Sequence, residues 1–200
     1  MTKGMQAILV VWAVTAGTAA FADSLQLESS DVLSVSKQEL GVRFGLAAGG
    51  DLAPGGAHIS GNYLYRLSAV DWFEAEAAFT YGGGDRGCVE AESFQCDHGL
   101  VGGSAISVTA GVRRFFSVQG RFHPFAKLGL SFRTISFSAD EVRGIAVPLV
   151  LGGGVRARVG DRVAVVGGAT AQFGPAWFNH GFGLESQFVF VVTGGVEFSL

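Results

Sequence analysis

The last part of the chain alternates strictly between two kinds of side chain. From residue 188 onward, every second position is apolar or glycine: Phe188, Phe190, Val192, Gly194, Val196, Phe198 and Leu200. The positions between them include polar residues such as Gln187, Thr193 and Glu197. Because a period of two places neighbouring side chains on opposite faces of a strand, residues 188–200 are predicted to form a β-strand with one apolar face.

The same alternation recurs in seven segments further upstream. They are residues 40–48, 58–67, 72–81, 105–116, 122–133, 147–158 and 163–173. One face of each carries Phe, Val, Leu, Ile or Tyr, while Gly, Ser, Thr and nearly all the charged residues fall on the other. Segments of about ten residues with this pattern are typical of strands that cross a membrane.

Short and long connections alternate between these eight segments. The short ones are 68–70, 118–120 and 160–161, and the longer ones are 49–57, 82–103, 136–144 and 174–184. Outer-membrane barrels have short turns on the periplasmic side and long loops outside. We therefore expect residues 40–200 to form an eight-stranded antiparallel up-and-down transmembrane β-barrel in the cell outer membrane. Both termini would lie in the periplasm and the long loops would be extracellular.

The composition of the chain argues against a soluble domain and against a helical membrane protein. Hydrophobic residues make up 48% of the chain and charged residues only 16%, below the roughly 25% typical of soluble domains. The chain beyond residue 22 has no run of 18 apolar residues, which excludes a spanning helix and leaves a closed barrel. A soluble barrel would turn its apolar face inward, whereas here the charges share a face with glycine. The net charge of −3 offers no basic surface for nucleic acid.

The first 22 residues have the features of an export signal. Lys3 precedes an apolar run over residues 7–14, and the segment ends in Ala20-Phe21-Ala22. A charged start, a short apolar middle and small residues at the exit are typical of a cleavable signal peptide. We expect cleavage after Ala22, which makes residues 23–39 a polar periplasmic segment.

The chain has two cysteines, Cys88 and Cys96, in the longest connection. In an exported protein such a close pair is predicted to form a disulfide that closes one loop. A metal site that combines them with Asp97 and His98 lacks the Cys-X₂-Cys spacing of zinc sites. No metal and no cofactor are expected.

Four segments carry a family resemblance: 72–76 (WFEAE), 110–116 (AGVRRFF), 121–129 (RFHPFAKLG) and 194–200 (GGVEFSL). With these, the chain resembles the small outer-membrane β-barrel superfamily of Gram-negative bacteria, which includes outer-membrane proteins A, X and W and the opacity proteins. The resemblance implies a membrane barrel that contacts outer-membrane lipid and lipopolysaccharide, and that is delivered by periplasmic chaperones to the barrel-assembly machinery. Val196, Phe198 and Leu200 would form the C-terminal assembly signal, although family members usually end on an aromatic residue.

Ten charged residues are predicted to face the lumen: Arg43, Arg66, Glu74, Glu76, Arg113, Lys127, Arg133, Arg156, Arg158 and Glu197. Unpaired charges in a dry lumen are costly, so these groups must pair or stay hydrated. Glu197 and Arg43 are expected to meet at the seam between the last and first strands. The set forms either a plug or an ion gate, and an eight-stranded barrel favours the plug because its interior is only wide enough for side chains.

The alternation also suggests partners for two of the lumen carboxylates and a position for one outward arginine. Glu74 and Glu76 are expected to pair with Arg113 or Arg66. Arg114 faces outward near the end of its strand, where its guanidinium can reach the interface with water.

The four histidines are the candidates for a catalytic base. The resemblance to lipid A deacylases would require a His-X-Ser-Asn pattern with a histidine base and a serine nucleophile. His58-Ile59-Ser60 comes closest, but it continues with Gly61 and is predicted to face the lumen. No set of nucleophile, base and orienting group stands out, so no enzymatic activity is predicted.

A structural or surface-interaction role is therefore expected, with the loops as the display. Loops on rigid scaffolds commonly carry binding. The candidate display residues are Asp85, Glu90, Glu92, Asp97 and Trp177. The alternative is a narrow channel for small solutes like outer-membrane protein W, which would need an apolar lumen. The protein is expected to act as a monomer, with a possible surface ligand.

Overall fold

The computed structural model describes residues 37–49, 53–82, 102–117, 120–137, 142–179 and 183–200, together with the backbone of 89–90 and 93–94. The predicted signal peptide and residues 23–36 lie outside the described residues. Within the described ranges, no helix is long and apolar enough to cross a bilayer. The strands are β1 (Gln38–Gly49), β2 (Gly56–Arg66), β3 (Asp71–Gly82), β4 (Val89–Glu90), β5 (Ser93–Phe94), β6 (Gly103–Phe115), β7 (Phe122–Phe137), β8 (Arg143–Ala146), β9 (Leu149–Arg158), β10 (Val163–Phe178) and β11 (Gly183–Ser199).

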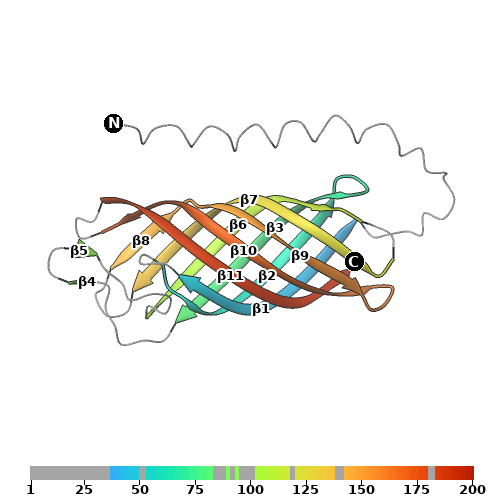
Figure 1. Ribbon diagram of the computed structural model, residues 1–200, viewed down its shortest axis with the longest axis horizontal. Coiled ribbons are helices and arrows are strands. Elements are labelled where there is room, and N and C mark those ends of the chain that lie inside the picture. The colour runs from blue at the N-terminus through green and yellow to red at the C-terminus, as the bar shows by residue number, and fades with distance from the viewer. Residues whose placement is uncertain are drawn as a thin grey trace, which may run out of the picture. The chain divides into compact units, whose positions relative to one another are not determined.

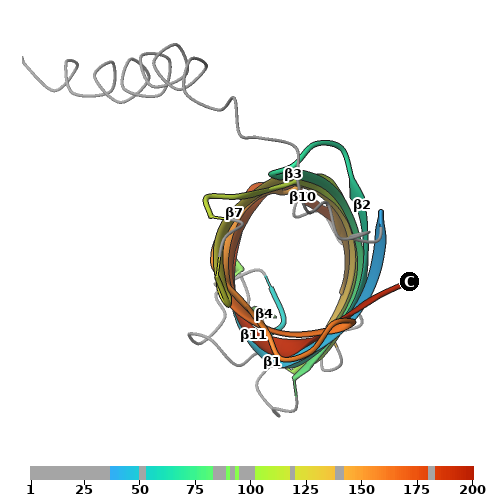
Figure 2. The same cartoon turned by 90° about the vertical axis from the view of Figure 1, so that its right-hand side faces the viewer.

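Nine of these strands form one antiparallel sheet that closes on itself (Figures 1 and 2). Sequence neighbours pair side by side, and the last strand, β11, returns to pair with β1 from Glu39↔Ser199 to Gly49↔Val189. Strands β4 and β5 pair only with each other. Closure leaves the main sheet without an edge, as a barrel requires.

Strands β8 and β9 together make one strand of the barrel. Both pair with β7 on one side and β10 on the other, in the same register, and only Val147 and Pro148 separate them. Proline has no N–H to give to a ladder. The ladder nevertheless continues, because Ser131 N–H donates to the Pro148 carbonyl at 2.9 Å and Val147 N–H to the Pro175 carbonyl at 3.0 Å. The barrel therefore has eight strands, as predicted.

The register also gives the stagger of the barrel. Starting at Glu39 and stepping from each residue to its partner on the next strand, the path ends on the first strand again at Gly49, ten residues further along. The partners on this path are Leu64, Glu74, Gly111, Gly129, Val150, Gln172 and Val189. This stagger requires strongly tilted strands, and eight strands leave an interior only wide enough for side chains.

The two faces of the sheet differ as the alternation predicts. Phe44, Leu130 and Phe188 are more than half exposed on the outside, and they are typical of an outer face made of Phe, Leu, Ile and Val. Most of the charged residues in the strands point inward and are buried, among them Arg43, Arg113 and Glu197. This polarity is the reverse of a soluble barrel, whose apolar face would line the interior.

Several strands are longer than the alternation alone suggested. Strand β7 runs to Phe137 and β10 to Phe178, and β11 starts at Gly183, so the connections predicted at 136–144 and 174–184 are shorter. Trp177 consequently lies on the outer face of β10 and not in a loop. At the other end of the barrel, β1 starts at Gln38, which brings Glu39 into the sheet.

Tight turns lie at the end of the barrel where β1 begins. Leu67 N–H donates to the Asp71 carbonyl at 2.9 Å, and Val159 N–H donates to the Val163 carbonyl at 3.1 Å. At the opposite end, Ala53 of the β1–β2 connection is fully buried in a cluster with the inward residues Ala47, Val189 and Val191. Ala53 therefore packs into the mouth of the barrel.

Candidate functional site

Strand β7 displays the layers of the lumen from one end to the other. Its buried inward positions, in order from the tight-turn end, are His123, Phe125, Lys127, Ser131, Arg133, Ile135 and Phe137. The chain thus passes from an aromatic layer through a charged layer to a polar layer, and then to an apolar layer at the mouth. On the neighbouring strand β6 the inward residues follow the same order, from Phe115 and Arg113 through Thr109 and Ser107 to Ala105.

The charged layer is an ion cluster of eight side chains from six strands, and we call it the lumen ion cluster. All its members are at most 10% exposed at the side chain. Four are carboxylates and four are cations, so the formal charges balance. The members are Glu39, Arg43, Glu74, Glu76, Arg113, Lys127, Arg156 and Glu197.

Arg113 lies at the centre of the lumen ion cluster. Its Nε and Nη2 atoms donate to the two carboxylate oxygens of Glu74 at 3.0 and 2.7 Å, a bidentate pair. Its Nη1 atom donates to Glu197 Oε1 at 2.7 Å. Such charge-assisted pairs fix the position of both side chains. The guanidinium is fully buried, and its two carboxylate partners come from strands β3 and β11.

Glu197 is shared by three arginines. Besides Arg113, it meets Arg43 with Nη2 to Oε1 at 2.8 Å and Arg156 with Nε to Oε2 at 3.2 Å. Arg156 also donates to Glu39 Oε1 at 2.8 Å. The contact of Arg43 with Glu197 lies at the β1–β11 seam, where the sequence placed it.

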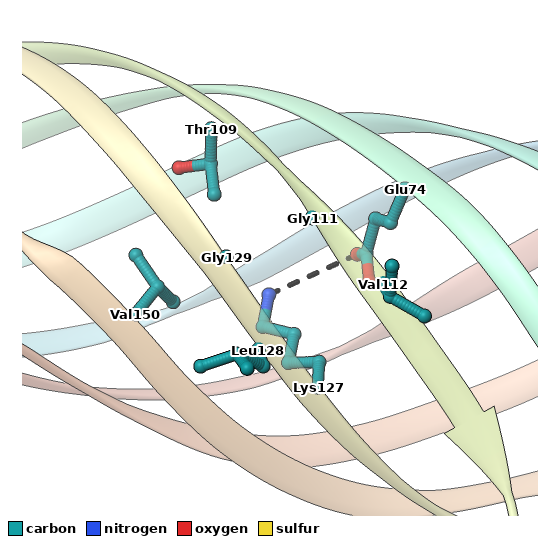
Figure 3. Close-up of a pocket in the computed structure, with 8 residues that line it drawn as sticks. All are labelled: Glu74, Thr109, Gly111, Val112, Lys127, Leu128, Gly129 and Val150. Atoms are coloured by element: carbon teal, nitrogen blue, oxygen red, sulfur yellow. Dashed lines mark ion pairs between the residues drawn. The ribbon is translucent and has the colours of Figure 1, made fainter.

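Glu76 pairs with Lys127 at 3.2 Å and with Arg43 at 3.3 Å, and not with Arg113 or Arg66. Figure 3 shows Lys127 reaching toward Glu74 from the neighbouring wall, at 3.8 Å. Beside them, the glycines at 111 and 129 help to line a small cavity of about 10 Å³, which is room for about one water molecule.

An aromatic layer closes the tight-turn end of the lumen. Trp72, Phe115 and Phe125 pack there with two aliphatic side chains, and the rings of Phe115 and Phe125 meet at 5.8 Å between centroids. The Arg113 guanidinium lies over the Phe125 ring at 4.6 Å, which joins the aromatic layer to the ion cluster. We did not predict this layer, although all three aromatic residues stand at inward positions of the alternation.

Three of the predicted lumen charges lie outside the ion cluster. Arg66 is half-buried at the end of β2, and its Nε donates to the Ser68 carbonyl at 3.1 Å. Arg158 is exposed at the end of β9. Both are the last residues of their strands, so they lie at the rim of the barrel and not among the buried charges. Arg133 is buried in the lumen but makes no ion pair with any described residue.

Two members of the lumen hydrogen-bonding system were not predicted. Glu39 was assigned to the polar segment before the barrel, but it lies in β1 with 1% of its side chain exposed. Asn62 is buried next to the cluster and donates to Glu197 at 3.5 Å. The alternation, continued one position before Leu40, would have placed Glu39 in the lumen. The outward Arg114 is exposed and pairs weakly with Asp71 at 3.7 Å.

Toward the mouth, the lumen is polar and then apolar. His58 shares a 2.9 Å hydrogen bond with Thr80, and the Thr109 hydroxyl donates to Ser131 at 3.0 Å. Beyond them lies an apolar cluster on one wall, made of Ala105, Ile135, Phe137, Val142, Ala146, Ala176 and Phe178. In the part of the barrel that the structure describes, clusters of buried residues thus lie toward both ends of the lumen.

Most of the predicted loop residues lie outside the described residues: Cys88, Cys96, Asp85, Glu92 and Asp97. Glu90 lies in β4, where it pairs with Ser93 along the backbone. Val196 is half-buried, and Phe198 and Leu200 are exposed on the outer face at the end of the chain.

The histidines offer no catalytic set within the described ranges. His123 Nδ1 contacts the Ser117 carbonyl at 2.9 Å, His58 contacts Thr80, and the other two histidines lie outside the described residues. No group of three metal-ligating side chains occurs among the residues that the structure describes.

The architecture is similar to that of solved membrane barrels. Neisserial surface protein A superposes with a TM-score of 0.56 at 13% identity, over 82% of this chain and 96% of that chain. The N-terminal β-barrel domain of Pseudomonas aeruginosa OprF superposes with a TM-score of 0.51 at 15% identity, over 82% of this chain and 98% of that chain. The chain has the fold of the small outer-membrane β-barrels. No protein-family model and no curated protein matches the sequence.

At identities this low the likeness concerns the fold alone. It agrees with the resemblance that the sequence suggested and with the eight-stranded count. The function has to be argued from the residues of this chain.

Proposed function

We propose that this protein is an integral outer-membrane barrel with a closed lumen and a structural or surface-interaction role. Residence in a membrane is supported by the outer face. Side chains such as Phe44, Leu130 and Val192 are each more than half exposed there, and a continuous apolar face of this extent is unfavourable in water. Lipid chains would cover this face without cost.

The proposed orientation rests on the two ends of the barrel. The tight turns after β2 and β9 lie at the end where β1 begins and β11 finishes, and the longer connections lie at the other end. Since such barrels keep short turns in the periplasm, the termini would be periplasmic and the longer connections extracellular.

A closed lumen is supported by the buried charges at its centre. Arg113 and Glu197 meet in the middle of the lumen, and neither side chain has any exposed surface. A water-filled passage would leave the charged side chains around it accessible to solvent. An aromatic layer on one side and apolar clusters on the other add to this closure.

A closed barrel leaves its outer face and its extracellular end for interaction. The partners that we propose are outer-membrane lipid and lipopolysaccharide, and a surface ligand bound by the loops. Periplasmic chaperones and the barrel-assembly machinery would serve its biogenesis. The similar Neisserial protein is named a surface protein, which agrees with this role.

Planar-bilayer recording of the refolded protein tests the closed lumen. The expected result is no steady unitary conductance from the wild type. The double variant Arg113→Ala with Glu197→Ala removes the central pair while keeping the net charge, and it should conduct in small steps. Steady conductance from the wild type would instead favour the narrow channel for small solutes.

A further inference from the structure

Arg133 breaks the charge balance of the lumen. The lumen ion cluster pairs four carboxylates with four cations, and Arg133 is a fifth buried cation, 2% exposed, with no ion pair to any described carboxylate. Its Nε and Nη1 atoms have no hydrogen-bond partner among the described residues. Among the described residues, the lumen therefore encloses one more buried cation than buried carboxylates.

No described residue around Arg133 supplies a counter-charge. It lies on β7 three inward positions beyond Lys127, on the mouth side of the ion cluster. Its registered neighbours are Ser107 on β6 and Ala146 on β8, which are both small and buried. Glu185 lies near the mouth end of β11. It is a described carboxylate, but it forms no ion pair with Arg133.

A guanidinium cannot escape this situation by losing its proton, because arginine stays protonated in proteins. Burial without a partner is costly for a charged group, and hydrogen bonds from neutral groups do not cancel the charge. The registered neighbours Ser107 and Ala146 are small and carry no charge, so neither can neutralise the guanidinium. What such a site fits is a single small group of one negative charge.

We propose that Arg133 anchors a binding site for one small monovalent anion, of halide or nitrate size, enclosed in the polar layer of the lumen. Its Nε and Nη1 atoms would donate to the anion. One anion would make the enclosed charges equal. The apolar cluster and the buried Ala53 at the mouth would keep the anion out of bulk solvent.

The first experiment measures anion-dependent stability. The barrel is refolded into phosphatidylcholine vesicles and unfolded with urea in chloride or in the bulky anion gluconate, at the same ionic strength. The wild type should gain stability with chloride, by about tenfold in the folded-to-unfolded ratio for each tenfold rise in chloride well above the dissociation constant. The variant Arg133→Met should lose this dependence, and the exposed-site control Arg158→Met should keep it.

The second experiment locates the anion in the wild type, so it does not depend on the folding of any variant. Crystals are soaked in bromide, and the anomalous signal of bromine is mapped. A peak within hydrogen-bonding distance of the Arg133 guanidinium is the expected result. The proposal is overturned if no peak lies there, or if wild type and Arg133→Met respond equally to chloride. It is also overturned if the density shows a carboxylate of the chain itself against the guanidinium. None of these outcomes depends on whether the lumen conducts.

Discussion

Arg113 and Glu197 join opposite walls of the barrel through a 2.7 Å contact between Nη1 and Oε1. Arg113 belongs to β6 and Glu197 to β11, and three barrel strands separate β6 from β11 in either direction round the ring. A buried pair across the full width of the lumen connects strands that share no backbone hydrogen bond. Side-chain electrostatics therefore holds the shape of the barrel together with the closed ladder.

Glu197 is the residue whose loss should cost most stability. Glu197→Gln removes the charge that three buried arginines share, and breaking a buried pair in this way costs about 3–5 kcal/mol of unfolding free energy. Urea unfolding in lipid vesicles measures it. Glu185→Gln on the same strand is the matched control, since Glu185 forms no ion pair with the described residues and should change stability by about 0.5 kcal/mol or less. Equal effects of the two substitutions would contradict a central role for Glu197.

Two adjacent glycines on β11 should respond in opposite ways to alanine. A Cβ on Gly195 would meet the backbone of β1 at the seam, at the Val42 carbonyl and 2.7 Å from the Arg43 Cα, so Gly195→Ala should destabilise by about 1–3 kcal/mol. A Cβ on Gly194 would find only the Val166 carbonyl at 3.9 Å. Gly194→Ala should be neutral or stabilise by up to about 1 kcal/mol. Equal losses in the same unfolding assay would show that the seam is looser than described.

A charged residue on the outer face should cost more folding free energy the deeper it lies in the bilayer. Leu130 lies midway along β7 and Phe122 at its end, and both are more than half exposed. Leu130→Arg should cost about 2–4 kcal/mol, and Phe122→Arg only about 0–1 kcal/mol, because the cost falls from the middle of the bilayer to its surface. Folding titrations in vesicles compare the two variants. Identical costs would argue against a membrane around this face.

Orientation can be read with single cysteines in a chain whose Cys88 and Cys96 are replaced by serine. Ala69 lies in a tight turn, and Asn179 lies at the opposite end after β10; both are exposed. In intact cells, a membrane-impermeant maleimide should label Asn179→Cys and not Ala69→Cys. After the outer membrane is permeabilised, both should react. The reverse pattern in intact cells would invert the proposed topology.

The period-two pattern predicted the barrel and the inward faces well, for a physical reason. Residue parity alone decides which face a strand residue occupies, so Arg43, Glu74 and Glu197 could be assigned to the lumen without knowing the fold in detail. Pairing across the lumen is different, since it depends on the stagger of the strands. Stagger is a property of the closed ring and not of any single segment. For this reason Glu76 meets Lys127 and Arg43 instead of its predicted partners.

Strand ends account for most of the remaining differences. Arg66 and Arg158 have inward parity, but each is the last residue of its strand and lies at the rim of the barrel. Trp177 was assigned to a loop because the alternation weakens at Gly174 and Pro175, whereas the ladder with β11 continues through both. Glu39 was left out of the predicted first strand, which began one position later, at residue 40. The alternation of side chains predicts strand ends poorly, because there the pairing with a neighbouring strand extends the sheet, whatever the side-chain type.

The most direct test is the environment of single nitroxide labels along β11 in lipid vesicles. Labels at Phe188, Phe190 and Val192 should be accessible to oxygen dissolved in the lipid and protected from a water-soluble nickel chelate. Labels at Val189 and Val191 should be shielded from both reagents, because those positions face a filled lumen. Nickel access at Val189 and Val191 would reveal a water-filled lumen, and oxygen access at those positions in place of the phenylalanines would show that the sheet faces the other way.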